Sequence, residues 1–212
     1  MDCALVTLAT GRRALNLREL AEHLRVVDLD SIYYHFWGTL LRPGFDHPEF
    51  NNDFAAWARH ALHDYVLAER LAVVDPAEYE DLEDLRRDLL DIIEERLDER
   101  EFVPWARSGQ QFNFLTAVLV VFDTHVRLDD PAALPSAVAE MSLGSIFYHF
   151  IDARRRDPKG LDDFRAWLCG ADGRYRDLCS ALAALDPYFS TLSQTRRRLA
   201  ALLADHLGKA GL

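Results

Sequence analysis

The stretch Ser31–Phe36 reads SIYYHF, and it returns further along the chain as SIFYHF at Ser145–Phe150. A second motif follows each copy in the same order, since Asp53–Trp57 reads DFAAW and Asp163–Trp167 reads DFRAW. Two motifs that keep their order and nearly their distance indicate an internal duplication. The sequence therefore predicts two halves with one three-dimensional plan, in which both tryptophans are buried.

The predicted fold is mainly α, an internally duplicated helical bundle with one short strand and about four helices in each half. The expected elements of the first half are a strand at about Ala4–Ala9, a helix at Leu17–Val27, helices capped by Ser31 and by Asp53, and a long acidic helix from Asp75–Pro76 to about Arg100. In the second half, Gly170 and Gly173 are expected to interrupt the third helix.

We expect the first repeat to span residues 1–107 and the second to span residues 108–212. An isolated pair of strands is marginally stable, so the simplest arrangement pairs the two strands across a pseudo-twofold axis and covers them with helices. A half of this size buries only a modest part of its surface, which favours fusion of the two repeats in one compact core.

The composition narrows the class of protein. The 212 residues carry a formal net charge of −11, which repels nucleic-acid phosphates and anionic lipids, so neither nucleic acid nor a membrane is an expected partner. The apolar run from Leu115 to Phe122 is far too short to cross a bilayer. The three cysteines fit free thiols in a reducing compartment, and we expect a cytoplasmic protein.

His35 and His149 are the clearest candidates for chemistry, because each occupies the same place in a repeated motif. With Asp53 and Asp163 nearby, they offer a candidate ligand or metal site or an acid and base pair. The favoured interpretation is structural: a histidine on a packed face donates a hydrogen bond to a neighbouring cap or carbonyl. No cofactor is expected.

Two runs of three arginines stand out in this acidic chain. They are candidate anion-binding residues, with the alternative that they stay solvated or pair with the acidic helix of the first repeat. These residues are Arg154, Arg155 and Arg156 in one run and Arg196, Arg197 and Arg198 in the other.

A loop in the first half carries large apolar side chains between turn residues. Phe45, His47 and Phe50 belong to this loop and form a candidate partner surface, although such residues also fold back onto a core.

At Tyr34–His35, Asn52–Trp57 and Leu67–Leu71, the chain resembles a small helical module with a Tyr-His, Asn-Asp-Phe-x-x-Trp, Leu-Ala-x-x-Leu pattern. Over nearly its whole length, the chain resembles an uncharacterised prokaryotic family of duplicated helical proteins that bear this pattern. Over Ser31–Leu71 alone it is similar to the C-terminal module of archaeal archaellum accessory proteins. The second half lacks the Leu-Ala-x-x-Leu continuation. The resemblance implies a duplicated helical fold and an assembly role, and it implies no activity.

These observations favour a non-enzymatic scaffold that binds a protein partner through its acidic helix and its aromatic loop. A homo-oligomer is compatible with this hypothesis. The alternative is a ligand- or metal-binding enzyme with a site near His35 and His149. No phosphate-binding loop, nucleophile elbow or zinc-protease helix is present to favour an enzyme.

Overall fold

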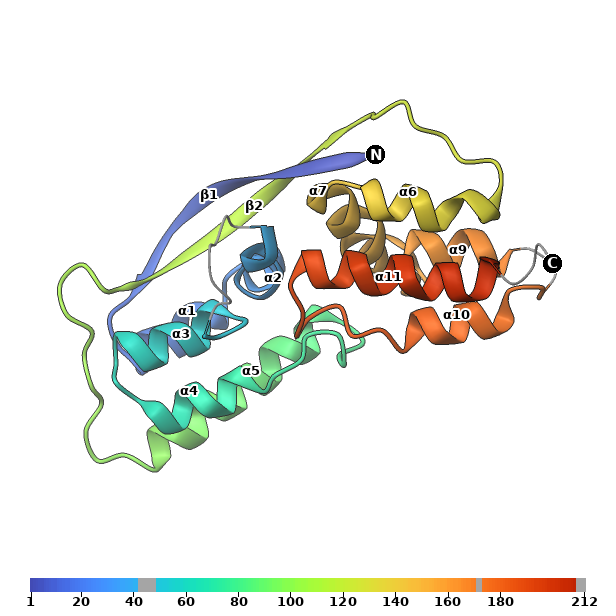
Figure 1. The fold of residues 1–212 in the computed structure, drawn as a ribbon. Helices are drawn as coiled ribbons and strands as arrows, with labels where there is room; N and C mark the ends of the chain where they lie inside the picture. Colours follow the sequence, from blue (N-terminus) through green and yellow to red (C-terminus); the bar gives the residue numbers. More distant parts are fainter. Residues whose placement is uncertain (42–48, 171–172, 209–212) are drawn as a thin grey trace. The chain divides into compact units, whose positions relative to one another are not determined.

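The computed structural model describes residues 1–41, 49–170 and 173–208 (Figure 1). The chain is mainly α, as expected, with a helical content of 55%. Strands β1 (Asp2–Ala14) and β2 (Phe112–Phe122) pair as a two-stranded antiparallel sheet. The hydroxyl of Thr10 on β1 donates a hydrogen bond of 2.7 Å to the carbonyl of Phe114 on β2. No helix in the described ranges is both long enough and apolar enough to span a membrane.

The chain divides into two compact units. Leu5–Val118 forms one, called here the N-terminal unit, and Met1–Ala4 with Leu119–Leu212 forms the other, the C-terminal unit. Both units therefore contain a piece of each strand. The units differ from the expected repeats 1–107 and 108–212 at the strands, and the repeat boundary stays a prediction.

The N-terminal unit packs its helices around an aromatic core. It contains α1 (Leu17–Leu24), α2 (Leu29–Trp37), the short 3₁₀ helix η1 (Gly38–Leu41), α3 (Asp53–His60), α4 (Tyr65–Ala72) and α5 (Leu82–Asp98). Helix α3 packs on α4, and α5 contacts α1, α2 and α4. The phenyl rings of Phe54 and Phe112 stack with centroids 5.0 Å apart, and that of Phe114 meets Phe112 edge-on. Burial of such rings stabilises the contact between the helices and β2.

Several predicted boundaries are wrong. Strand β1 runs well beyond Ala4–Ala9. Helix α2 begins after Asp28, and Ser31 lies within it, because the Ser31 hydroxyl donates to β2 and does not cap the helix. The N-cap of α3 is Asn52, whose side chain accepts from the backbone N–H of Ala55. Asp53 is thus the first helical residue. Its carboxylate lies beside His35 and does not cap the helix.

Other ends also differ from the sequence prediction. Helix α1 ends at Leu24, not Val27, because the Arg86 guanidinium binds the carbonyls that follow, including that of Val27. The acidic helix α5 begins after its N-cap Asp81, whereas Asp75 forms a separate turn. Helix α4 was not predicted, so the described residues of this half form one α-helix more than expected, besides the short 3₁₀ helix η1.

The C-terminal unit is also helical. It contains η2 (Pro131–Ala133), α6 (Leu134–Glu140), α7 (Leu143–Ile146), the π-helix η3 (Phe147–Asp152), α8 (Ala153–Arg156), α9 (Asp163–Cys169), α10 (Arg176–Ala183) and α11 (Leu192–Leu207). Helix α11 contacts α6, α7 and α10, and α9 contacts α10 and η3. The predicted interruption after Trp167 is confirmed, since α9 ends at Cys169 with Gly170 as its C-cap, and Gly173 has a φ of +74°.

The two repeated tryptophans have different environments. Trp57 is buried, and its indole N–H donates a hydrogen bond of 2.7 Å to the carbonyl of Gln110. Trp167 is 39% exposed, so the prediction that it is buried is wrong. In the N-terminal unit Phe112 also packs edge-on against Trp57, which explains why this indole is covered.

Candidate functional site

His35 joins three elements of the N-terminal unit. Its Nδ1 lies 2.8 Å from an Asp53 carboxylate oxygen on α3, and the backbone N–H of Leu115 on β2 donates to its Nε2 over 3.0 Å. An imidazole that accepts at Nε2 carries its proton at Nδ1 and donates it to the carboxylate. Both ring nitrogens are therefore engaged, and the buried ring links α2 to α3 and β2.

Ser31 reinforces this link on the same strand residue. Its hydroxyl donates a hydrogen bond of 2.7 Å to the carbonyl of Leu115, whose N–H already binds His35. Helix α2 therefore satisfies both backbone groups of Leu115 at the edge of β2 that faces away from β1. Without these side chains, the polar backbone groups of this strand would lose their partners at a partly buried position.

His149 forms the corresponding pair in the C-terminal unit. Its Nδ1 lies 2.7 Å from a carboxylate oxygen of Asp163, and the Arg156 guanidinium lies 3.4 Å from the same oxygen. The guanidinium also donates to the carbonyl of Tyr148 and stacks over its ring. Burial raises the pKa of Asp163, but the hydrogen bond from His149 and the charge of Arg156 outweigh it, so this pKa lies below 3.8.

The two histidine pairs differ in their openness. The side chain of His149 is 20% exposed against 2% for His35. Within the described part of the chain, no hydrogen-bond partner faces Nε2 of His149. In the same ranges, no three His, Cys, Asp or Glu side chains gather in a way that would hold a metal ion. Each pair alone supplies two ligands, fewer than protein zinc sites use. The candidate ligand or metal site of His35, His149, Asp53 and Asp163 stays a hypothesis.

The first arginine run lies among aspartates of its own unit. Arg155 and Arg156 bind the buried carboxylate of Asp152, at 3.3 and 3.0 Å. Arg154 lies 3.9 Å from Asp162 and stacks over Phe150. The acidic partners of this run among the described residues thus belong to the C-terminal unit, whereas the acidic helix of the first repeat was the expected partner.

The second arginine run is more open. Arg196 donates to the carbonyl of Met141, and Arg198 donates to the hydroxyl of Ser190. Arg197 is exposed on α11. Anion binding by either run stays a prediction.

Most of the candidate aromatic loop lies outside the described residues, including Phe45 and His47. Phe50 is described and half-buried, and its ring lies 6.0 Å from that of His60.

Cys3 lies at the start of β1, within the C-terminal unit. Its thiol donates to the carbonyl of Gly144 over 3.2 Å, and the backbone N–H of Tyr148 also points to the sulfur. In an α-helix these two backbone groups would bind each other. The inserted thiol thus explains why the chain continues as the π-helix η3. A side chain at Gly144 would collide with Asp2 and with the carbonyl of Cys3.

Cys3→Ala is expected to flatten the loss of stability at high pH. Burial, with the nearby charges of Asp2 and Asp152, raises the pKa of the Cys3 thiol from 9.0 to about 12. The unfolded chain therefore ionises first, so the contribution of this group to stability is present below pH 9.0 and is lost as the pH rises toward about 12. Between about pH 7 and about pH 10, wild type should lose roughly 1–1.5 kcal/mol more than Cys3→Ala in urea unfolding. Equal losses would contradict this assignment.

Strand β1 presents an apolar outer face in the N-terminal unit. The Thr7 hydroxyl lies 3.1 Å from that of Tyr34 on α2, so Val6 and Leu8 point to the opposite side. They are 49% and 45% exposed. On β2 the buried Phe114 faces the helices, which places its neighbour Leu115 on the outer face. The sequence did not predict this surface, because apolar residues fall on both faces of both strands, and β2 is apolar at nearly every position.

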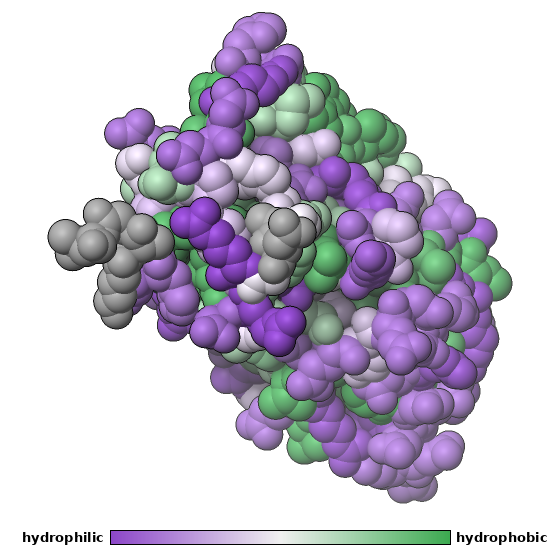
Figure 2. All heavy atoms as spheres, turned by 90° about the vertical axis from the view of Figure 1, so that its right-hand side faces the viewer, coloured by the Kyte–Doolittle hydropathy of each residue, from purple (hydrophilic) through white to green (hydrophobic). Residues whose placement is uncertain are grey.

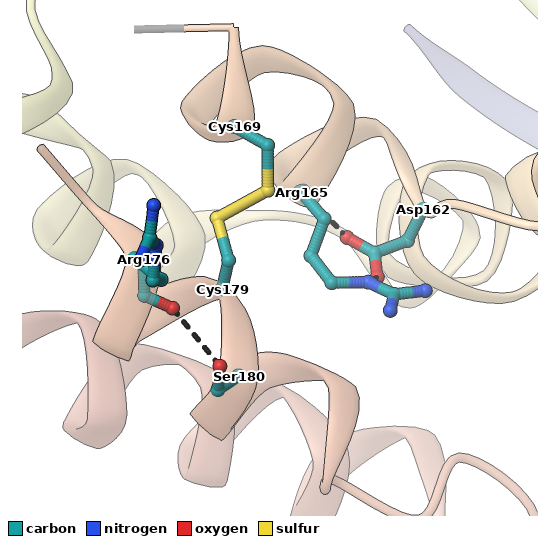
Figure 3. Close-up of a disulfide and its surroundings, with 6 residues drawn as sticks. All are labelled: Asp162, Arg165, Cys169, Arg176, Cys179 and Ser180. Atoms are coloured by element: carbon teal, nitrogen blue, oxygen red, sulfur yellow. Dashed lines mark hydrogen bonds and ion pairs between the residues drawn. A yellow bond between two sulfur atoms is a disulfide. The ribbon is translucent and has the colours of Figure 1, made fainter. Parts of the chain in front are cut away.

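Cys169 at the end of α9 and Cys179 on α10 form a disulfide (Figure 3), with Cα atoms 6.5 Å apart. The prediction of three free thiols is therefore wrong for this pair, and only Cys3 has a free thiol in the structure. Their separation of 10 residues carried no pairing signal in a chain with an odd number of cysteines. The disulfide also removes one argument for a cytoplasmic location.

Residues 1–204 match the family described as "Family of unknown function (DUF5752)". The chain belongs to the DUF5752 family. This confirms the expected membership in an uncharacterised family over nearly the whole chain. A solved structure of OrfY from Thermoproteus tenax is similar to this DUF5752 chain, with 33% identity and a TM-score of 0.82, over 97% of this chain and 93% of OrfY. No curated protein matches this chain. The likeness to archaellum accessory proteins is not confirmed.

Proposed function

We propose that this protein is a non-enzymatic scaffold that binds an extended segment of a partner protein along strand β1. The apolar outer face of the sheet carries the proposal. An antiparallel sheet with one face on its core usually turns polar residues to water on the other face. Here Val6 and Leu8 occupy that face and are nearly half exposed. An exposed apolar face of this kind is typical of a binding surface.

Within the N-terminal unit, the edges of the sheet favour addition of a strand to β1. At Leu115, the outer edge of β2 is bound to His35 and Ser31 of α2. Among the described residues, no third strand lies beside β1. An open edge offers unpaired N–H and C=O groups to an incoming strand, and alternate side chains give specificity.

Charge adds a preference for the partner. Arg12 and Arg13 are exposed at the end of β1, in a chain whose net charge is −11. A segment that carries apolar residues opposite Val6 and Leu8, followed by acidic residues, would complement this strand.

On the face in Figure 2, polar side chains predominate and apolar ones form separate groups, as is ordinary for a protein surface.

The internal duplication is part of this proposal, and equivalent contacts support it. His35 binds Asp53 as His149 binds Asp163. Ser31 donates to the carbonyl of Leu115, and Ser145 donates to that of Met1. The two halves would then fix a strand to a helix in the same way, although their exposed surfaces would serve different functions.

The alternative function is a ligand-binding or metal-binding enzyme, and it now rests on His149. The specific observation is that Nε2 of this ring has no partner among the described residues, whereas Nε2 of His35 accepts from the backbone. The alternative predicts stoichiometric zinc in purified protein, or a rise in Tm with added zinc that His149→Ala abolishes. Protein without zinc, and without such a rise, would remove it.

Site-directed crosslinking in cells tests the proposed surface. We expect Val6 replaced by the photoreactive residue p-benzoylphenylalanine to give a discrete heavier adduct after irradiation. The same residue at Val73, which is 75% exposed, is the control and should give none. An adduct of twice the chain mass would identify a second copy of this chain in place of a partner. The absence of any adduct at Val6, or equal adducts at both positions, would contradict the proposal.

A further inference from the structure

We infer that Cys169 and Cys179 form an exchangeable redox pair, in which Cys169 is the site of covalent modification by a low-molecular-weight thiol such as glutathione. The inference is independent of the proposed function. It rests on the position of the two sulfurs in the C-terminal unit. Cys169 is exposed as the last residue of α9, whereas Cys179 is half-buried within α10 (Figure 3).

Access favours attack on one sulfur over the other. Exchange requires a thiolate to approach one sulfur, and the exposed Cys169 is the more accessible of the two. Cys3 is buried and bonded to Gly144, so it does not compete as the attacking thiol. The attacking thiol therefore comes from solution.

The surroundings also favour Cys179 as the leaving group. It lies in the first half of α10 (Arg176–Ala183), where the helix dipole stabilises negative charge. Cys169 ends α9, where the dipole opposes a thiolate.

The exchange balances in two steps. A glutathione thiolate attacks Sγ of Cys169, a new sulfur–sulfur bond forms, the Cys169–Cys179 bond breaks, and its electron pair leaves on Cys179, which takes a proton from water. A second glutathione thiolate attacks the glutathione sulfur of this mixed disulfide, which yields oxidised glutathione and releases Cys169 as a thiolate that is then protonated. Overall, the chain gains two electrons and two protons, and two glutathiones are oxidised. Oxidised glutathione drives the reverse reaction.

Reduction would release the connection between α9 and α10. Helix α9 has seven residues and buries only Phe164 and Leu168, so its own contacts hold it weakly. Gly170 and Gly173 follow it and favour no helix. Trp167, two residues before Cys169, is positioned to report the change by fluorescence.

Intact-mass measurement of two variants, each with one cysteine of the pair replaced, tests the asymmetry. Each variant is first loaded with one glutathione by oxidised glutathione. We expect reduced glutathione to remove it about tenfold faster from Cys169→Ser than from the matched variant Cys179→Ser, because the thiolate of Cys179 is the better leaving group. Both variants keep Cys3. The double variant, which combines Cys169→Ser and Cys179→Ser, should gain no glutathione from oxidised glutathione. Equal rates in the two single variants would overturn the assignment of Cys169.

A measurement on the wild-type chain keeps the test valid if a variant folds poorly. Reduced glutathione should release two thiols from the oxidised chain, change the Trp167 emission and leave a trappable mixed disulfide whose peptide map places glutathione on Cys169. Oxidised glutathione should restore the starting state. Glutathione mapped to Cys179, or failure of reduced glutathione to release thiols from the folded chain, would overturn the inference.

Discussion

Asp64→Ala is expected to lower the free energy of unfolding by about 3–5 kcal/mol, the usual result of removing one partner of a buried ion pair. The Asp64 carboxylate is fully buried. Arg96 of α5 donates to both of its oxygens over 3.0–3.2 Å, and Arg100 lies 3.4 Å from one of them. The same carboxylate caps α4 by accepting from the backbone N–H of Leu67. The variant would leave two guanidinium groups without this carboxylate and would remove the cap.

The control for this prediction is Asp91→Ala. Asp91 is exposed on α5 and has no ion-pair partner among the described residues. Its removal should change stability by no more than about 0.5 kcal/mol. Urea unfolding followed by circular dichroism measures both variants. A loss below about 1 kcal/mol for Asp64→Ala would show that this cluster does not hold α4 to α5.

His35→Phe is expected to lower the free energy of unfolding by about 2–3 kcal/mol, although phenylalanine has a similar shape. The change leaves the backbone N–H of Leu115 without its acceptor and removes the donor to Asp53. An unmade hydrogen bond at a buried site costs more than a made one contributes. Ring packing against Phe112 and Phe114 is kept, so the loss reports the hydrogen bonds.

The matched variant His149→Phe separates the two histidine pairs. His149 loses only its bond to Asp163, because no described residue faces its Nε2. Its loss should be about 1–1.5 kcal/mol, roughly half that of His35→Phe. The same urea experiment applies. Equal losses for the two variants would contradict the claim that, of the two histidines, only His35 binds a strand.

The sequence predicted the helices better than their ends, and the reason lies in tertiary contacts. The spacing of Leu17, Leu20 and Leu24 is sufficient to predict α1, since these side chains are all buried. Ser31 and Asp53 look like N-caps in isolation, but the first binds Leu115 and the second binds His35. Long-range hydrogen bonds of this kind leave no local signal.

The candidate site was partly predictable. The repeated motifs pointed to His35 and His149 with their aspartates, and each histidine lies within hydrogen-bond distance of its aspartate, which is the first residue of its helix and not the predicted cap. The outer face with Val6 could not be predicted, because residues of both faces of these strands are apolar and the period of two is lost. The disulfide depends on the approach of two helices, which the spacing of their cysteines does not encode.

Hydrogen exchange of the chain, alone and with the partner recovered by crosslinking at Val6, tests the central claim most directly. If a partner segment adds to the open edge of β1, the backbone amides of Leu5–Thr10 should exchange at least about tenfold more slowly in the complex. Each amide N–H would either gain a hydrogen bond or have its existing hydrogen bond shielded from water. The amides around His149 should be unaffected. Slower exchange around Tyr148–Asp163 with no change along β1 would contradict the account and favour a site at His149.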